Sequence, residues 1–265
     1  MLTQRKLAEQ LALRLYWRGM DDRDLEYSRE PVFLTAEWRH LAMLNYEVDP
    51  KLLTQFVPVG AMLDSWNGKT FISLVGFRFL KTRVRGVSLP FHRNFDEINL
   101  RLYVRREDEP NIKRGVVFIR EIVPRRLIAA VARGFYNERY VALPMSHNIR
   151  IGGDAAEVEY GWKFNGTWNK LSLKADTAPT LPQEDSEQEF ITEHYWGYAS
   201  QRDGGCMEYE VRHPRWKVWT ACEASFEGKV DELYGREFGS VLKDSPTSAF
   251  LAEGSLISVC RGRRL

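Results

Sequence analysis

The stretch NFDEINLRLYVR at residues 94–105, which YVALPMS follows at residues 140–146, decides how the rest of the chain is interpreted. Apolar and polar residues alternate through its first part, and this period predicts a β-strand with one buried face. Glu97, Asn99 and Arg101 share the other face. A carboxylate, an amide and a guanidinium on one face are typical of a binding site, although they name no reaction.

Two interpretations of this polar face stay open at the level of periodicity. On the solvated side of a sheet, Glu97 and Arg101 would form an ordinary surface ion pair. Inside a β-rich core a carboxylate is costly unless it is paired, and an arginine is its natural partner. Only the fold can separate a surface pair from a pocket.

The composition excludes several function classes. The chain has 265 residues, 44% of them hydrophobic, and a formal charge of +2, so nothing in the overall charge indicates a nucleic-acid or membrane partner. Basic residues outnumber acids between Arg101 and Arg139, and we interpret most of them as solvated strand ends and helix faces. The three cysteines lack metal-ligand spacing and indicate reduced thiols of a cytoplasmic protein.

Hairpin signals run along most of the chain and predict the fold class. Asn67-Gly68 and Asn165-Gly166 are typical of tight hairpin turns, and alternating segments flank both of them. Asp49-Pro50 predicts the start of a short helix, and residues 124–136 have helical spacing. We therefore expect a mainly β (α+β) fold, a single antiparallel β-barrel or sandwich with a few peripheral helices.

The N-terminal residues differ in pattern from the rest. Leu7, Leu11 and Leu15 recur every four residues and predict an amphipathic helix, which we expect to pack on the protein's own body. We place this helix and a charged connector at residues 1–31 and one β domain at residues 32–260. No run of membrane-spanning length occurs, and no secretory signal is expected.

The usual catalytic and cofactor motifs are missing. The five histidines have no metal-ligand spacing, no Gly-x-Ser-x-Gly elbow is present, and the glycine pairs fit turns and not a phosphate cradle. We expect no metal and no cofactor.

The quoted motif resembles the YqjF-like family of uncharacterised proteins, which is similar to acetoacetate decarboxylase. The matching residues are the Asn-Phe-x-Glu-x-Asn-x-Arg-x-Tyr-Val-Arg run at 94–105, Leu143-Pro144, Val48-Asp49-Pro50 and His213-Pro214-x-Trp216. By eye, the resemblance covers roughly residues 32 to 260. It implies an acetoacetate decarboxylase-like barrel around a small ligand pocket.

The resemblance also implies a changed site. The decarboxylase forms a Schiff base through a lysine in a Pro-Lys-Lys motif, and here Met145 occupies the lysine's place. A thioether forms no imine. Glu97 matches one pocket glutamate, and Arg39 falls where the substrate-binding arginine would lie.

Three functional hypotheses follow. The first is a pocket for a small polar or anionic metabolite, lined by Glu97, Arg39, Asn99, Arg101 and Met145, in which Glu97 could act as a general acid–base. The second is a non-catalytic binding or sensing protein on the same scaffold. The third, ranked last, is imine chemistry through another lysine such as Lys163 or Lys174. Whether the chain is an enzyme, and whether it forms a homo-oligomer, stay open.

Overall fold

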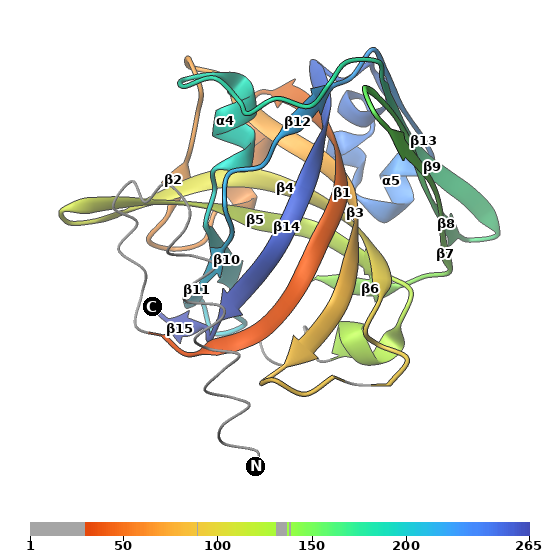
Figure 1. Cartoon of the computed structure of the whole chain (residues 1–265). Coiled ribbons are helices and arrows are strands. Elements are labelled where there is room, and N and C mark those ends of the chain that lie inside the picture. Colours follow the sequence, from red (N-terminus) through yellow and green to blue (C-terminus); the bar gives the residue numbers. More distant parts are fainter. Residues whose placement is uncertain (1–29, 89, 131–136, 138) are drawn as a thin grey trace.

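The computed structural model describes residues 30–88, 90–130, 137 and 139–265, and the fold is mainly β (Figure 1). The expected helix around Leu7, Leu11 and Leu15 lies outside the described residues, as does part of the expected helix at 124–136, of which residues 126–130 are helical.

Seven strands pair side by side in a closed circuit of hydrogen-bonded neighbours. The circuit runs β14–β1–β3–β4–β5–β10–β11 and returns from β11 to β14. Its members are β1 (Val32–Val48), β3 (Thr70–Val84), β4 (Phe95–Asp108), β5 (Asn111–Val123), β10 (Trp196–Ser200), β11 (Cys206–Arg212) and β14 (Ser248–Cys260). Short strands extend this sheet: β2 (Met62–Leu63), β6 (Tyr140–Ala142), β12 (Val218–Thr220) and β15 (Arg263–Arg264).

A second, four-stranded sheet packs outside the circuit. It contains β7 (Met145–Gly152), β8 (Ala155–Phe164), β9 (Thr167–Ala175) and β13 (Glu223–Glu227). Figure 1 shows it to one side of the circuit, with α5 (Val230–Leu233) nearby. The remaining short elements are α2 (Pro50–Leu53), α4 (Glu187–Thr192), η1 (Thr54–Phe56), η2 (Arg236–Phe238) and η3 (Val241–Lys243).

Two hydrophobic clusters lie on opposite faces of the main sheet. The outer cluster joins residues such as Leu100 of β4 to Trp162 and Tyr160 of β8. The inner cluster lies inside the circuit and includes Phe77 of β3 and Trp216. Because successive residues of a strand point to opposite faces, each long strand contributes to both clusters.

A bulge in β1 changes which residues face inward. His40 has φ of 56°, and the pairing with β3 shifts register between Arg39 and Ala42. Trp38 therefore packs inward, whereas Ala42 and Leu44 belong to the outer cluster. A strict period of two would place Trp38, Ala42 and Leu44 on one face, but the bulge inserts an extra residue and reverses the alternation.

Other local predictions are confirmed in part. The Asp49 side chain accepts from the Lys51 amide at 2.9 Å and caps α2, as expected. Asn67 and Gly68 form the expected turn, but β2 before it pairs with β4 and not with β3. The sheets are not purely antiparallel, since β5 pairs in parallel with both β6 and β10.

Gly254 provides a stability test of the β1 bulge. It has φ of +77°, and a Cβ there would lie 2.0 Å from the Trp38 carbonyl oxygen. Gly68 has a similar φ of +78° and open space around it. We expect Gly68→Ala to lower the free energy of unfolding by about 1 kcal/mol, from φ alone. Gly254→Ala should cost about 2 kcal/mol more, because strand backbone must shift.

Urea unfolding of both variants measures the difference. Equal losses would show that β1 and β14 tolerate a side chain between them, contrary to this packing.

Candidate functional site

A cavity of about 420 Å³ lies inside the circuit of strands. Aliphatic and aromatic side chains line it, and the aromatic ones include Trp38, Phe77, Phe79, Phe95, Phe118 and Trp216. Trp38 meets Phe77 edge-on at 5.4 Å between ring centroids, and Phe79 stacks on Phe95 at 4.6 Å. A cavity of this volume with such walls suits a small molecule with an apolar body.

The polar face of β4 lies against this cavity. Glu97, Asn99 and Arg101 all line it. Glu97 and Asn99 are each 2% exposed, and Arg101 is partly buried. The alternation of β4 therefore places a polar row in an apolar interior and not on a solvated surface.

Glu97 has only neutral hydrogen-bond partners among the described residues. Asn99 Nδ2 donates to its Oε1 at 3.2 Å, and Tyr140 Oη donates to its Oε2 at 3.1 Å. Burial raises the pKa of Glu97 to about 7, although these two hydrogen bonds oppose the rise. At neutral pH Glu97 is therefore divided between its protonated and ionised forms.

A second buried carboxyl group, Glu121, belongs to the same polar cluster. It lies opposite Asn99 in the β4–β5 pairing and opposite Tyr140 in the β5–β6 pairing, and it lines the cavity. Burial, followed by the charges of Glu121 and Glu97, raises the pKa of Tyr140 well above its ordinary value. Tyr140 is therefore a phenol, able to donate a hydrogen bond, at every physiological pH.

Arg101 provides a cation further along the same strand. Its Nε donates to Tyr103 Oη at 3.3 Å, and its Nη2 donates to the Ile191 carbonyl at 3.3 Å. Within the described part of the chain, no carboxylate pairs with Arg101 and no acceptor reaches Nη1. Because an unpaired guanidinium in an apolar site is costly, Arg101 is suited to binding an anion there.

Two neutral histidines lie near this cation. His213 Nδ1 lies 2.9 Å from the Pro214 carbonyl, which can only accept, so Nδ1 carries the hydrogen and Nε2 is an acceptor. Burial lowers the pKa of His213 to about 4. Burial also lowers the pKa of His194, against the opposing effect of Asp64, whose carboxylate lies 3.3 Å from His194 Nε2. Arg101 is therefore the cation of this group.

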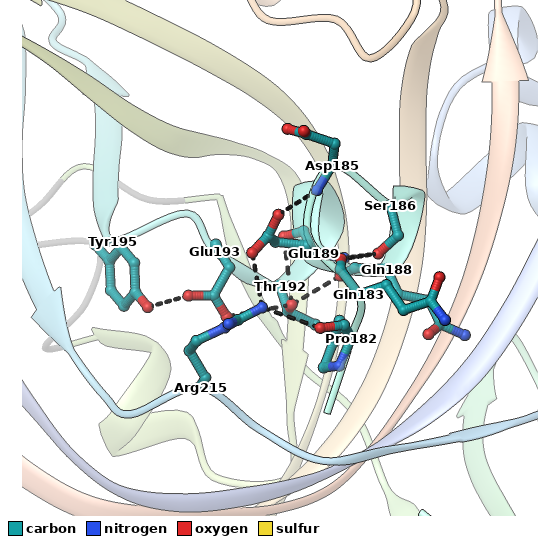
Figure 2. Close-up of polar contacts among 10 residues, drawn as sticks. All are labelled: Pro182, Gln183, Asp185, Ser186, Gln188, Glu189, Thr192, Glu193, Tyr195 and Arg215. Carbon is teal, nitrogen blue, oxygen red and sulfur yellow. Dashed lines mark hydrogen bonds and ion pairs between the residues drawn. The ribbon is translucent and has the colours of Figure 1, made fainter. Parts of the chain in front are cut away.

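Helix α4 contributes Ile191 and Thr192 to the wall of the cavity, and Figure 2 shows the contacts that hold the helix. Ser186 caps the helix by accepting from the Glu189 amide at 3.2 Å. The Glu189 carboxylate accepts from the Asp185 amide and from Arg215, each at 2.7 Å (Figure 2). These contacts fix the helix whose Ile191 carbonyl accepts from Arg101.

Arg39 and Met145 do not line the cavity. Arg39 lies on the other face of β1, where its guanidinium bonds Glu37 at 3.3 Å and the Gly254 carbonyl at 3.1 Å. Met145 begins β7, in the second sheet, and packs against the outer cluster. The sheet therefore separates both from Glu97 and Arg101.

No described residue that lines the cavity is a lysine. Lys163 and Lys174 are exposed on the second sheet, and Lys174 pairs with Glu223 at 2.8 Å. Among the described residues no cluster of histidine, cysteine or carboxylate side chains is arranged to hold a metal ion. None of the helices in the described ranges is long and apolar enough to cross a membrane.

A family described as "Uncharacterized conserved protein", DUF2071, matches residues 35–255. The chain belongs to the DUF2071 family. It is also 28% identical over 205 residues to the uncharacterised protein YqjF of Bacillus subtilis (strain 168), covering 75% of this chain and 80% of YqjF. The expected resemblance to the YqjF-like family is confirmed.

Two solved structures show the fold that this DUF2071 protein shares. Acetoacetate decarboxylase of Legionella pneumophila matches with a TM-score of 0.61 and 13% identity, over 92% of this chain and 93% of that one. The enduracididine biosynthesis enzyme MppR, solved in complex with pyruvate, matches with a TM-score of 0.60 and 13% identity, over 91% and 93%. At this identity the likeness shows an acetoacetate decarboxylase-like fold.

Sequence reasoning missed Glu121, Tyr140, His194 and His213 as cavity residues. Because Val116 and Phe118 line the cavity, the alternation of β5 would place Glu121 on the outer face with Ile119, but the structure turns it inward, opposite Asn99. A register shift between β4 and β5 at Leu100 and Arg101 sets this pairing. The sequence carries no local signal for this burial, because Glu121 stands between Arg120 and Ile122 and not within an apolar run.

The raised pKa of Glu97 predicts a pH-dependent stability. Its pKa is 4.5 in the unfolded chain and about 7 in the folded protein. The contribution of Glu97 to stability is therefore fully present below pH 4.5 and is lost as the pH rises through 7. Relative to wild type, Glu97→Gln should gain about 3 kcal/mol in the free energy of unfolding between about pH 4.5 and about pH 8.

Urea unfolding of both proteins across this range measures the gain. Glu157→Gln, in which an exposed carboxylate of β8 is removed, is the matched control. Parallel stability curves for Glu97→Gln and wild type would show that Glu97 is ionised throughout.

Proposed function

We propose that the circuit of strands acts as a barrel around a binding site for a small molecule with an apolar body and one anionic group, such as a carboxylate. The observation that supports this most directly is Arg101, a cation that lines an apolar cavity and has no carboxylate partner among the described residues. A ligand carboxylate would supply the missing charge and accept from Nη1.

The remaining polar groups of the cavity fit the other end of such a ligand. Glu97 in its protonated form can donate to a carbonyl or hydroxyl oxygen, and Asn99 Oδ1, buried without a donor in the described structure, can accept from one. The aromatic walls would enclose the apolar body between these groups and Arg101. Arg39 and Met145 remain predictions from the resemblance and are not part of this site.

The related folds are consistent with this ligand class. Acetoacetate and pyruvate, named for the two solved neighbours, are small carboxylates with a carbonyl group. In our proposal this protein shares the preference for a carboxylate but not the Schiff base, because no described lysine lines the cavity.

The proposed anion site predicts a preference between two matched probes. Wild-type protein should bind 3-phenylpropionate at least about 10-fold more tightly than 3-phenylpropanamide, because only the carboxylate pairs with Arg101. Arg101→Met should abolish this preference and leave amide binding unchanged. Isothermal titration calorimetry measures both affinities.

Arg150→Met is the control, because Arg150 is exposed on β7 and pairs only with Glu157 among the described residues. Equal affinity of wild type for the two probes would contradict the proposed site.

A second candidate function is acid–base catalysis by Glu97, favoured by its burial and by a pKa of about 7. A carboxylate with this pKa can take a proton from the carbon next to a ligand carbonyl and return it. In D₂O, wild-type protein should accelerate the exchange of the C3 protons of 2-oxo-4-phenylbutanoate, followed by proton NMR.

Glu97→Gln should reduce this exchange by at least about 100-fold and retain binding of the keto acid. If wild-type protein binds the keto acid but the protons exchange at the uncatalysed rate, catalysis by Glu97 is wrong and only the binding function stands.

A further inference from the structure

A chain of hydrogen-bonded polar side chains, buried at Tyr103, Ser73 and Asn45, leads from Arg101 to α4. Arg101 bonds Tyr103 at 3.3 Å, Tyr103 bonds Ser73 at 2.6 Å, and Ser73 bonds Asn45 at 2.6 Å. Asn45 then bonds Ser248 at 3.0 Å, and Ser248 bonds Glu187 in the first turn of α4. We call the residues Tyr103, Ser73, Asn45, Ser248 and Glu187 the relay.

The strand register produces this relay. Ser73 lies opposite Arg101 in the β3–β4 pairing, and Asn45 lies opposite Ser73 in the β1–β3 pairing. Ser248 lies opposite Asn45 in the β1–β14 pairing. Polar residues at one level of four neighbouring strands therefore form a row, and Asn45 and Ser73 are fully buried within it.

The chemistry of the two ends fixes the direction of every hydrogen bond. A guanidinium only donates, so Tyr103 accepts from Arg101 and gives its own hydrogen to Ser73. A carboxylate only accepts, so Ser248 donates to Glu187 and accepts from the Asn45 amide nitrogen. The Asn45 amide oxygen then accepts from Ser73. All the donors point away from Arg101.

Hydrogen bonds that run in this direction stabilise the Arg101 guanidinium and leave its Nη1 group available to a ligand. Each relay group turns a partly negative oxygen toward Arg101, and the full negative charge lies at the far end, on Glu187. A carboxylate next to Arg101 would instead neutralise it and take the hydrogen bonds that face the cavity. None of the relay residues lines the cavity, whereas Arg101 does.

We propose that the relay is a positioning and specificity device: it holds the Arg101 guanidinium in place and keeps its charge available, and so sets the preference of the cavity for anionic over neutral ligands. This inference rests on the proposed function for its effect on ligands. Its effect on Arg101 itself can be measured without any ligand.

Two relay variants test the proposal. Asn45→Asp keeps the shape but puts a carboxylate three hydrogen bonds from Arg101, which competes with a ligand anion. It should lower the affinity ratio of 3-phenylpropionate to 3-phenylpropanamide by at least about 10-fold. Tyr103→Phe removes one hydroxyl and should lower the same ratio about 3-fold or more by releasing Nε.

Thr70→Val is the matched control. Thr70 is buried on β3 and donates to the Val48 carbonyl at 2.6 Å, outside the relay. Its removal should lower stability, as the relay variants do, and leave the ratio unchanged. If the ratio falls equally in Thr70→Val, the relay residues contribute only to stability and the proposal is wrong.

Nitrogen-15 NMR of the arginine side chains gives the readout without ligand. The Arg101 Nε–H signal, assigned by its loss in Arg101→Met, should lose at least about 10-fold of its protection from solvent exchange in Tyr103→Phe. Unchanged protection would overturn the relay whatever the protein binds. Protection that falls as expected, in a wild-type protein that binds both probes equally, would instead contradict the proposed function.

Discussion

The cost of removing polar groups from water is the constraint on which this structure depends. Seven strands close on themselves and place the inner face of each one in a shared interior. Every polar side chain on those faces must find its partner there or carry an energetic penalty. Glu97 meets this constraint with a raised pKa, and Arg101 meets it through neutral oxygens. In both cases a group that can form further hydrogen bonds faces the cavity.

The parts of the fold that the sequence predicted are those determined by neighbours along the chain. Alternation shows that Glu97, Asn99 and Arg101 share a face of one strand, and Asp49-Pro50 predicts a capped helix start. The cluster around Glu97 depends instead on which strands are neighbours and in what register. Tyr140 reaches Glu97 from a strand that pairs in parallel with β5, and no local pattern specifies such a pairing.

Arg39 shows the same limit of sequence-based prediction, because it was expected at the site and does not line the cavity. The resemblance to acetoacetate decarboxylase placed it at the site, yet the bulge at His40 divides β1 into two stretches of opposite alternation. A single inserted residue determines which face a side chain occupies, and it leaves no periodic signature. Met145 likewise lies in the second sheet, with the main sheet between it and the cavity. A shared fold therefore does not by itself determine which residues line the cavity.

The position of β14 has a consequence for biosynthesis. This strand is almost the last part of the chain, yet it pairs with β1, near the beginning, and with β11 and β12. Asn45 and Ser248, which bond across the β1–β14 seam, are 203 residues apart. On the ribosome, β1 therefore has an open edge until the 203 positions from Asn45 to Ser248 have been synthesised. An unpaired strand edge can pair with other chains, so the long separation of β1 and β14 exposes the growing polypeptide to that side reaction until the circuit closes.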